Sequence, residues 1–196
     1  MRSMLMVMAA SLAVLAGAAT APEAQQSFGS FKGKVIASFL PDGRNMRLEQ
    51  PFGYVDPKGK HWDVPAGEET DGASIPKAFW LMSPPFTGKY REAAVIHDYY
   101  CRKQAESWQA THNVFFDAMR AGGVDERTAK VMFAAVYNFG PRWGGGSTRR
   151  ATQRAEKPVS IEKQQEFMRD LGKWVDRSNP SREEIAKVVE MGAIPR

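Results

Sequence analysis

The sequence has a single cysteine, Cys101, among its 196 residues. An internal disulfide is therefore excluded, and the fold lacks the covalent link on which many small secreted domains depend. The hydrophobic content of 43% is enough for one ordinary globular core, which must hold the fold by itself. A reactive thiol needs an exposed, electropositive setting. We expect Cys101 instead to be a buried packing residue, one helical turn after a histidine.

Long hydrophobic runs are also scarce. The run from Leu5 to Ala16 follows the positive charge of Arg2 and is too short to anchor stably in a bilayer. Small residues come next, so residues 1–24 have the pattern of a secretory signal peptide that is cleaved between Ala18 and Ala24. No later run is long enough for a membrane helix. The sequence therefore predicts a periplasmic or secreted protein whose mature chain has no transmembrane segment.

The sequence contains no recognisable nucleic-acid-binding motif, and its net charge of +5 is modest. The basic residues are scattered, apart from a cluster beside a glycine-rich turn: Arg142, Arg149, Arg150 and Arg154. This cluster is an ordinary solvated loop or a contact to an anionic surface such as phospholipid or the cell envelope. Nucleic acid is not an expected partner.

The first third of the mature chain predicts short strands separated by turns. The candidate strands are Phe31–Leu40, Met46–Glu49, Phe52–Val55 and Lys60–Val64. Pro41–Arg44 and Asp56–Gly59 have the composition of turns. We expect a small antiparallel meander, followed by a loop over residues 65–76.

Helical patterns fill the rest of the chain. They comprise a short helix Lys77–Met82 opened by Pro76, then Lys89–Lys103, Ser107–Arg120, Asp125–Asn138, Ile161–Asp176 and a last helix that reaches Met191. Ser181 and Glu184 form a capping box for the last one. The predicted fold is α+β: a small antiparallel β-meander followed by a three-helix core, with a C-terminal helical extension. The domains are a core at 28–143, a basic glycine-rich linker at 144–158 and a helical hairpin at 159–196, which packs on the core or binds a partner.

Reactive side chains interrupt the apolar pattern of the helix at 89–103. His97 lies on its apolar face, and Asp98 points about 100° away around the helix. A short connection makes the next helix antiparallel, so His112 can face His97. Asp71, in the loop after the strands, can approach from the sheet side. A buried imidazole or carboxylate is costly without a partner, and a core histidine bonded to a backbone carbonyl is the structural interpretation.

Several separated motifs resemble the bacterial and phage family catalogued as domain of unknown function 1353. They are Asp71-Gly-Ala-Ser-Ile-Pro76, Phe79-Trp80, Ala93-Ala-Val-Ile-His-Asp-Tyr99 and Phe115 to Met119, in that order. The resemblance covers about Phe31 to Trp143. It implies no established activity.

A second resemblance is to the helix pair of prokaryotic secreted phospholipases A2, in which a helix carries His-Asp and a nearby Tyr. It implies that His97 is the general base for water, and that Asp98 helps to hold a Ca²⁺ ion that polarises the ester. The residues Asp71 and Gly72 are further candidate ligands for this ion. The orienting Asp of that family falls at His112 here, and the family's glycine-rich Ca²⁺ loop with its cysteines is absent.

The candidate site therefore has catalytic residues His97 and His112. Aromatic residues near them are candidates for substrate contact: Tyr99, Tyr100 and Trp80. Zn²⁺ bound by two histidines and carboxylates is an alternative to Ca²⁺. The non-enzymatic alternative is a binding or assembly module, phage-derived or envelope-associated, in which His97 and Asp98 form a structural network and no ion is bound.

Overall fold

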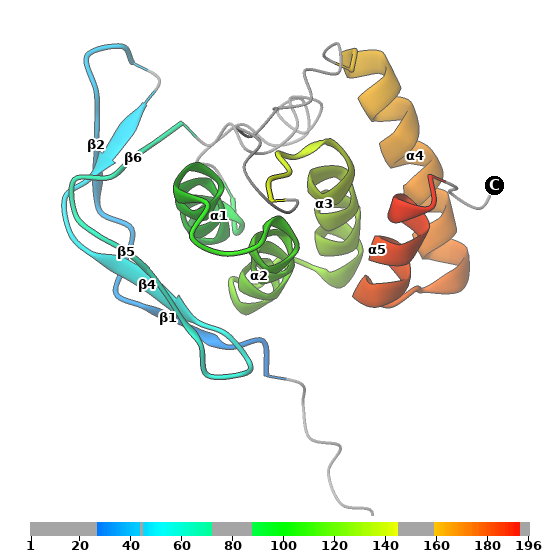
Figure 1. Cartoon of the computed structure of the whole chain (residues 1–196), viewed down its shortest axis with the longest axis horizontal. Helices are drawn as coiled ribbons and strands as arrows, with labels where there is room; N and C mark the ends of the chain where they lie inside the picture. The colour runs from blue at the N-terminus through cyan, green and yellow to red at the C-terminus, as the bar shows by residue number, and fades with distance from the viewer. Residues whose placement is uncertain (1–26, 44, 72–87, 145–158, 193–196) are drawn as a thin grey trace, which may run out of the picture.

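The computed structural model describes residues 27–43, 45–71, 88–144 and 159–192. Strands form a curved layer along one side, α1, α2 and α3 lie in the middle, and α4 and α5 lie on the far side of α3 (Figure 1). The strands are β1 (Ser30–Lys32), β2 (Ala37–Phe39), β3 (Met46–Leu48), β4 (Phe52–Val55), β5 (His61–Val64) and β6 (Glu69–Thr70). The helices are α1 (Arg91–Lys103), α2 (Trp108–Ala121), α3 (Glu126–Phe139), α4 (Ile161–Ser178) and α5 (Arg182–Glu190). The predicted α+β class is confirmed.

The strands form two antiparallel sheets with the orders β1-β4-β5 and β2-β3-β6. The single strand predicted over Phe31–Leu40 is wrong, because β1 and β2 belong to different sheets. Gly33, between them, has φ +78°, which no extended strand adopts. Strand β6 also forms within the predicted loop, where Thr70 pairs with Met46 of β3.

The hairpin of β4 and β5 matches the prediction, and its turn is stabilised by one carboxylate. Asp56 accepts hydrogen bonds from the backbone amides of Lys58 and Lys60 and from the indole of Trp62. The pairing places Tyr54 opposite Trp62, and both side chains are buried against the helices. This sheet therefore packs against α1.

The three central helices begin and end within two residues of their predicted bounds. Ser107 caps α2 by accepting from the amide of Ala110, and Asp125 caps α3 by accepting from the amide of Thr128. Their buried residues form one hydrophobic cluster with the strands, with Phe115 and Phe133 fully enclosed. This packing fixes the faces on which the polar side chains of α1 and α2 meet.

The helices α4 and α5 pack on α3 and extend the same cluster through Leu171 and Ile185. The predicted capping box of α5 is present. At the start of α5, Arg182 donates to both carboxylate oxygens of Asp117 on α2, each at 2.8 Å. Of the two alternatives for this hairpin, packing on the core is the observed one. The predicted helix at 77–82 and residues 145–158 of the predicted linker lie outside the described residues.

Among the helices that the structure describes, none combines the length and apolarity needed to cross a membrane.

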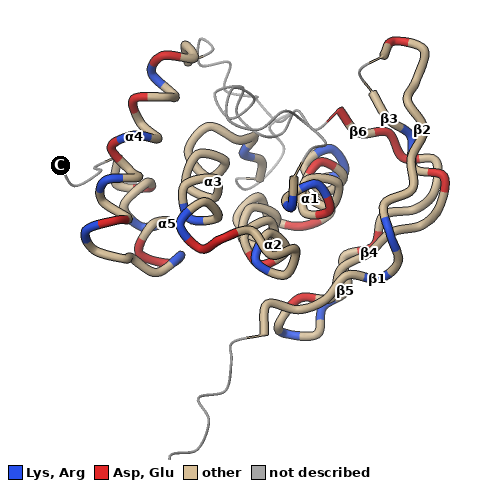
Figure 2. Tube along the Cα trace, turned by 180° about the vertical axis from the view of Figure 1, so that it is seen from behind, with Lys and Arg blue, Asp and Glu red and all other residues tan. Residues whose placement is uncertain are grey.

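Charges of both signs alternate along α4 and α5, as the blue and red segments in Figure 2 show. The predicted signal peptide lies outside the described residues.

Candidate functional site

Helix α1 carries two neighbouring polar residues into different surroundings. Its side chains at His97 and Cys101 face α2, whereas Asp98 is turned toward β6. Both His97 and Asp98 are buried, with exposed fractions of 0% and 2%. The predicted rotation of about 100° between consecutive helical residues separates them. The structure therefore has two polar sites beside α1, not one.

The first site is a histidine pair between α1 and α2. His97 Nε2 and His112 Nδ1 are 2.9 Å apart, and His112, like His97, has no exposed surface. The ring of Phe115 covers His97 at a centroid distance of 4.8 Å. The two histidines therefore face each other across the helix pair, as predicted.

Both imidazoles are neutral at pH 7. Burial, and secondly the neighbouring His112, hold the pKa of His97 well below its usual value. Burial lowers the pKa of His112 to about 4, although the carbonyl of Pro141 opposes this shift. That carbonyl favours a proton on His112 Nε2, so Nδ1 accepts from His97 Nε2–H. Within the described residues, Nε2 of His112 has no hydrogen-bond partner.

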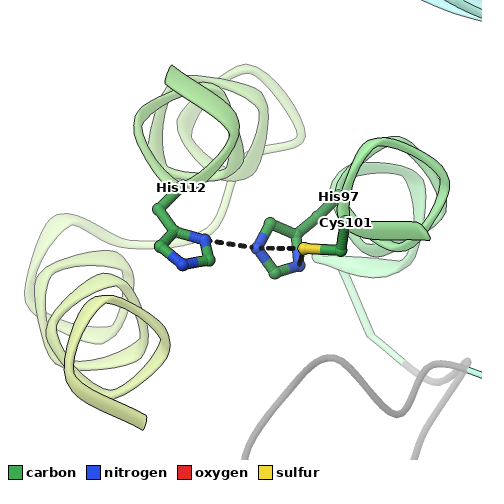
Figure 3. Close-up of side chains that lie close together, drawn as sticks. All are labelled: His97, Cys101 and His112. Atoms are coloured by element: carbon green, nitrogen blue, oxygen red, sulfur yellow. Dashed lines mark hydrogen bonds between the residues drawn. The ribbon is translucent and has the colours of Figure 1, made fainter. Parts of the chain in front are cut away.

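Cys101 completes the buried group. Its Sγ lies 3.5 Å from Nε2 and 3.9 Å from Nδ1 of His97, as seen in Figure 3. One ligand atom from each of His97, Cys101 and His112 lies within 4.8 Å of the other two. This cluster can hold a metal ion. The predicted burial of Cys101 is observed, but its contact with His97 was missed; the four-residue spacing on one helix could have revealed it.

Aromatic rings enclose His112 on its other sides. The centroids of Trp108, Tyr137 and Trp143 lie 5.6, 6.0 and 6.3 Å from that of His112. Gly140 fits against the same ring, since a Cβ there would lie 3.0 Å from His112 Cε1. The ring of His112 is therefore fixed in position by packing.

The second site is a cavity of about 450 Å³ next to Asp98. Thr70 Oγ1 donates to Asp98 Oδ2 at 2.5 Å. The described residues that line the cavity come from four separate parts of the chain: Asn45, Glu69, Thr70, Asp71, Asp98, Arg102 and Pro141. The structure thus brings together the predicted pair Asp71 and Asp98, but on a different side of α1 from the histidines. The other predicted ligand, Gly72, and the predicted contact residue Trp80 lie outside the described residues.

The comparison with protein families concerns a segment that contains the histidine pair, Cys101 and most of the described residues that line the cavity. Residues 46–136 match the model of a family described as "Protein of unknown function (DUF1353)". This segment belongs to the DUF1353 family. The predicted resemblance is therefore confirmed, and the DUF1353 segment includes His97, Cys101 and His112 as well as the two carboxylates.

Two curated relatives of this chain come from Sinorhizobium fredii (strain NBRC 101917 / NGR234). One, "Uncharacterized protein y4iH", is 45% identical over 104 residues, which are 53% of this chain and 44% of the relative. The other, "Uncharacterized protein y4jT", is 41% identical over 124 residues, or 62% and 37% of the two chains. This chain thus spans less than half the length of either. No solved structure matches the chain.

The tyrosines of the DUF1353 segment that were predicted to contact substrate are directed toward the sheet and the end of α1. The hydroxyl of Tyr100 accepts from the amide of Asp63 at 3.1 Å, and its ring packs against Trp62. The ammonium of Lys103 lies over the ring of Tyr99. Neither tyrosine is among the described residues that line the cavity.

Proposed function

We propose that the protein is exported and acts as a non-catalytic, envelope-associated binding module. The observation that supports this proposal is the enclosure of His97, which has no exposed surface and is hydrogen bonded to His112. A general base must reach the water or hydroxyl whose proton it removes. The imidazole of His97 is covered by Phe115 and hydrogen bonded to a second imidazole, so it cannot reach a substrate and instead stabilises the packing of α1 on α2.

Export is tested by the N-terminus of the natural product. Cleavage of the predicted signal peptide leaves a first residue between Ala19 and Gln25, which N-terminal sequencing of periplasmic or secreted material identifies. An intact Met1 in that material would remove the assignment to the envelope.

Binding to an envelope surface is tested with phospholipid vesicles. The net charge of +5 favours anionic over zwitterionic lipid, and salt should weaken the contact. In co-sedimentation at low salt we expect binding to vesicles rich in phosphatidylglycerol, and little binding to pure phosphatidylcholine. Equal retention on both lipids, or on neither, would contradict an electrostatic envelope contact.

A Ca²⁺-dependent ester hydrolase is the second candidate, and the cavity beside Asp98 favours it. Carboxylate oxygens are the ligands that Ca²⁺ prefers, and Asp71 and Asp98 line one cavity. A Ca²⁺ ion there would polarise an ester carbonyl. His97 faces α2 instead of this cavity, so this candidate needs another route for the proton.

Hydrolysis assays separate the two candidates. Phospholipid and simple esters are incubated with the mature protein in Ca²⁺ and in chelator, beside the variant Asp98→Asn. The binding module predicts no Ca²⁺-dependent turnover by any of them. Turnover by the wild type that is lost both in chelator and in Asp98→Asn would establish the hydrolase.

The candidate ions belong to different sites. Ca²⁺ is the ion for the oxygen ligands beside Asp98, whereas the nitrogen and sulfur atoms of the buried cluster suit Zn²⁺.

A further inference from the structure

We propose that His97, Cys101 and His112 form a structural site for one Zn²⁺-class ion that joins α1 to α2. Each residue supplies one donor: Nε2 of His97, Nδ1 of His112 and the Sγ of Cys101 (Figure 3). This proposal is independent of whether the module binds an envelope surface, because it concerns the interior of the helix pair.

Two of the three distances between donor atoms are close to what a tetrahedral ion requires, and one ligand atom from each residue lies within 4.8 Å of the other two. With Zn–N bonds of about 2.0 Å and a Zn–S bond of about 2.3 Å, two nitrogens lie roughly 3.3 Å apart and a nitrogen and a sulfur roughly 3.5 Å apart. The measured distance from Sγ to His97 Nε2 is 3.5 Å, and that between the two nitrogens is 2.9 Å. Because packing holds the His112 ring, a small rotation of the His97 side chain has to provide the extra separation that admits the ion.

The chemistry of the donor set selects the class of ion. Imidazole nitrogens and a thiolate are good ligands for Zn²⁺ and Co²⁺, whereas Ca²⁺ and Mg²⁺ require oxygen. All three donors are buried, with Cys101 exposed by 6%. Three protein donors leave one tetrahedral position for a further ligand such as water. Three protein donors with an open position are the pattern of catalytic zinc sites, but the burial of all three donors keeps substrate away and favours a structural role for the ion.

The surroundings of His112 support the same assignment. A histidine that binds a metal through one nitrogen usually directs its other N–H to a carbonyl or carboxylate. If Nδ1 binds the ion, Nε2 carries the proton, and the carbonyl that acts on it is that of Pro141. Gly140 and the aromatic rings around His112 hold this orientation. A ligand fixed before the ion arrives lowers the cost of binding.

Cobalt provides the direct test, because Co²⁺ takes the same ligands and absorbs light. The mature full-length chain is unfolded under reducing conditions and refolded with Co²⁺, since a buried site is filled as the protein folds. We expect one equivalent to remain after desalting, with a sulfur-to-cobalt charge-transfer band and the intense visible bands of a tetrahedral ion. Zn²⁺ should displace the cobalt and protect the thiol of Cys101 from modification.

One variant tests the sulfur ligand, and a second serves as its control. Cys101→Ser should remove the charge-transfer band and weaken Co²⁺ binding roughly a hundredfold or more, whereas His61→Ala changes an exposed histidine and should bind as the wild type does. If Cys101→Ser does not fold, the wild-type spectrum and the protection of the thiol by Zn²⁺ still decide the matter. The absence of a tetrahedral cobalt spectrum in folded wild type, or an unchanged spectrum in Cys101→Ser, would overturn the proposal.

Discussion

Two neighbouring residues of one helix, His97 and Asp98, have opposite surroundings. His97 is enclosed by α2 and hydrogen bonded to a second imidazole, whereas Asp98 lies beside a cavity and accepts a hydrogen bond from Thr70 of β6. Adjacent helical residues point about 100° apart, so a His-Asp pair in sequence does not form one site when helices and strands cover different faces. The geometry that a resemblance to phospholipase A2 implies, with a base beside a cation, is divided here between two sides of α1.

The largest effect that we predict is on the enclosed side. His97→Ala removes the partner of His112 Nδ1 and leaves a cavity under Phe115. The unpaired polar atom and the lost packing together should lower the free energy of unfolding by about 4 kcal/mol. Urea unfolding measures it, with His61→Ala as a matched control expected to change stability by less than about 0.5 kcal/mol. Equal stability of the two variants would mean that His97 is not part of the core.

Acid should destabilise the protein through the enclosed histidine pair. Because the pKa of His112 falls to about 4 on burial, the unfolded chain takes up its proton first as the pH decreases. Stability from this residue is complete above about pH 6.5 and is lost as the pH falls toward 4, by up to about 3 kcal/mol. Urea unfolding at several pH values, in chelator, measures the slope.

The variant His112→Phe is the control for this slope. It removes the titrating group but keeps an aromatic ring among Trp108, Tyr137 and Trp143, so its stability should depend less steeply on pH between 6.5 and 4. A slope identical to that of the wild type would mean that His112 is not the source of the acid sensitivity.

A smaller effect should come from the residue that supports His112 from behind. In Gly140→Ala the new Cβ would lie 2.3 Å from the carbonyl oxygen of Val136 and 3.0 Å from the imidazole. We expect a loss of about 2 kcal/mol from overpacking, measured as a lower midpoint in urea. Gly172→Ala, where the new Cβ meets only the end of the Arg127 side chain within 4 Å, should be neutral or stabilising. A Gly140→Ala variant as stable as the wild type would show that the backbone at Gly140 and the His112 ring have room to move.

The smallest effect should be on the cavity side. Asp98→Asn keeps an oxygen that accepts from Thr70 and loses the charge, so the cost should be about 1 kcal/mol. Thermal unfolding of Asp98→Asn beside His97→Ala compares the two sides directly. A loss in Asp98→Asn as large as in His97→Ala would break the distinction between a structural and a cavity-lining residue.

Much of the fold follows from local sequence signals. The caps Ser107 and Asp125 and the Ser181–Glu184 box mark helix starts in the sequence, and the structure places the helices there. The division of residues 30–39 between two sheets could not be foreseen. It depends on long-range pairing with β3 and β4, which carries no local signal beyond Gly33.

The candidate site was predictable only in part. The approach of His97 and His112 follows from antiparallel helices, and the divergence of Asp98 follows from helical geometry. The contact of Cys101 with His97 follows from their four-residue spacing on α1 and could have been predicted, whereas the enclosure of His97 by Phe115 depends on side-chain packing between α1 and α2, which the sequence does not specify. The solvent exposure of His97 therefore could not be predicted from the sequence.

The central claim is that His97 is enclosed, and chemical modification tests it most directly. The chain has three histidines, of which His61 is exposed and the other two have no exposed surface. The folded mature protein is treated with diethyl pyrocarbonate at pH 7, and each histidine is followed by peptide mass spectrometry. We predict rapid modification of His61 alone, with His97 and His112 reacting only after unfolding in denaturant. Modification of His97 in the folded protein at the rate of His61 would contradict the account and restore His97 as a candidate base.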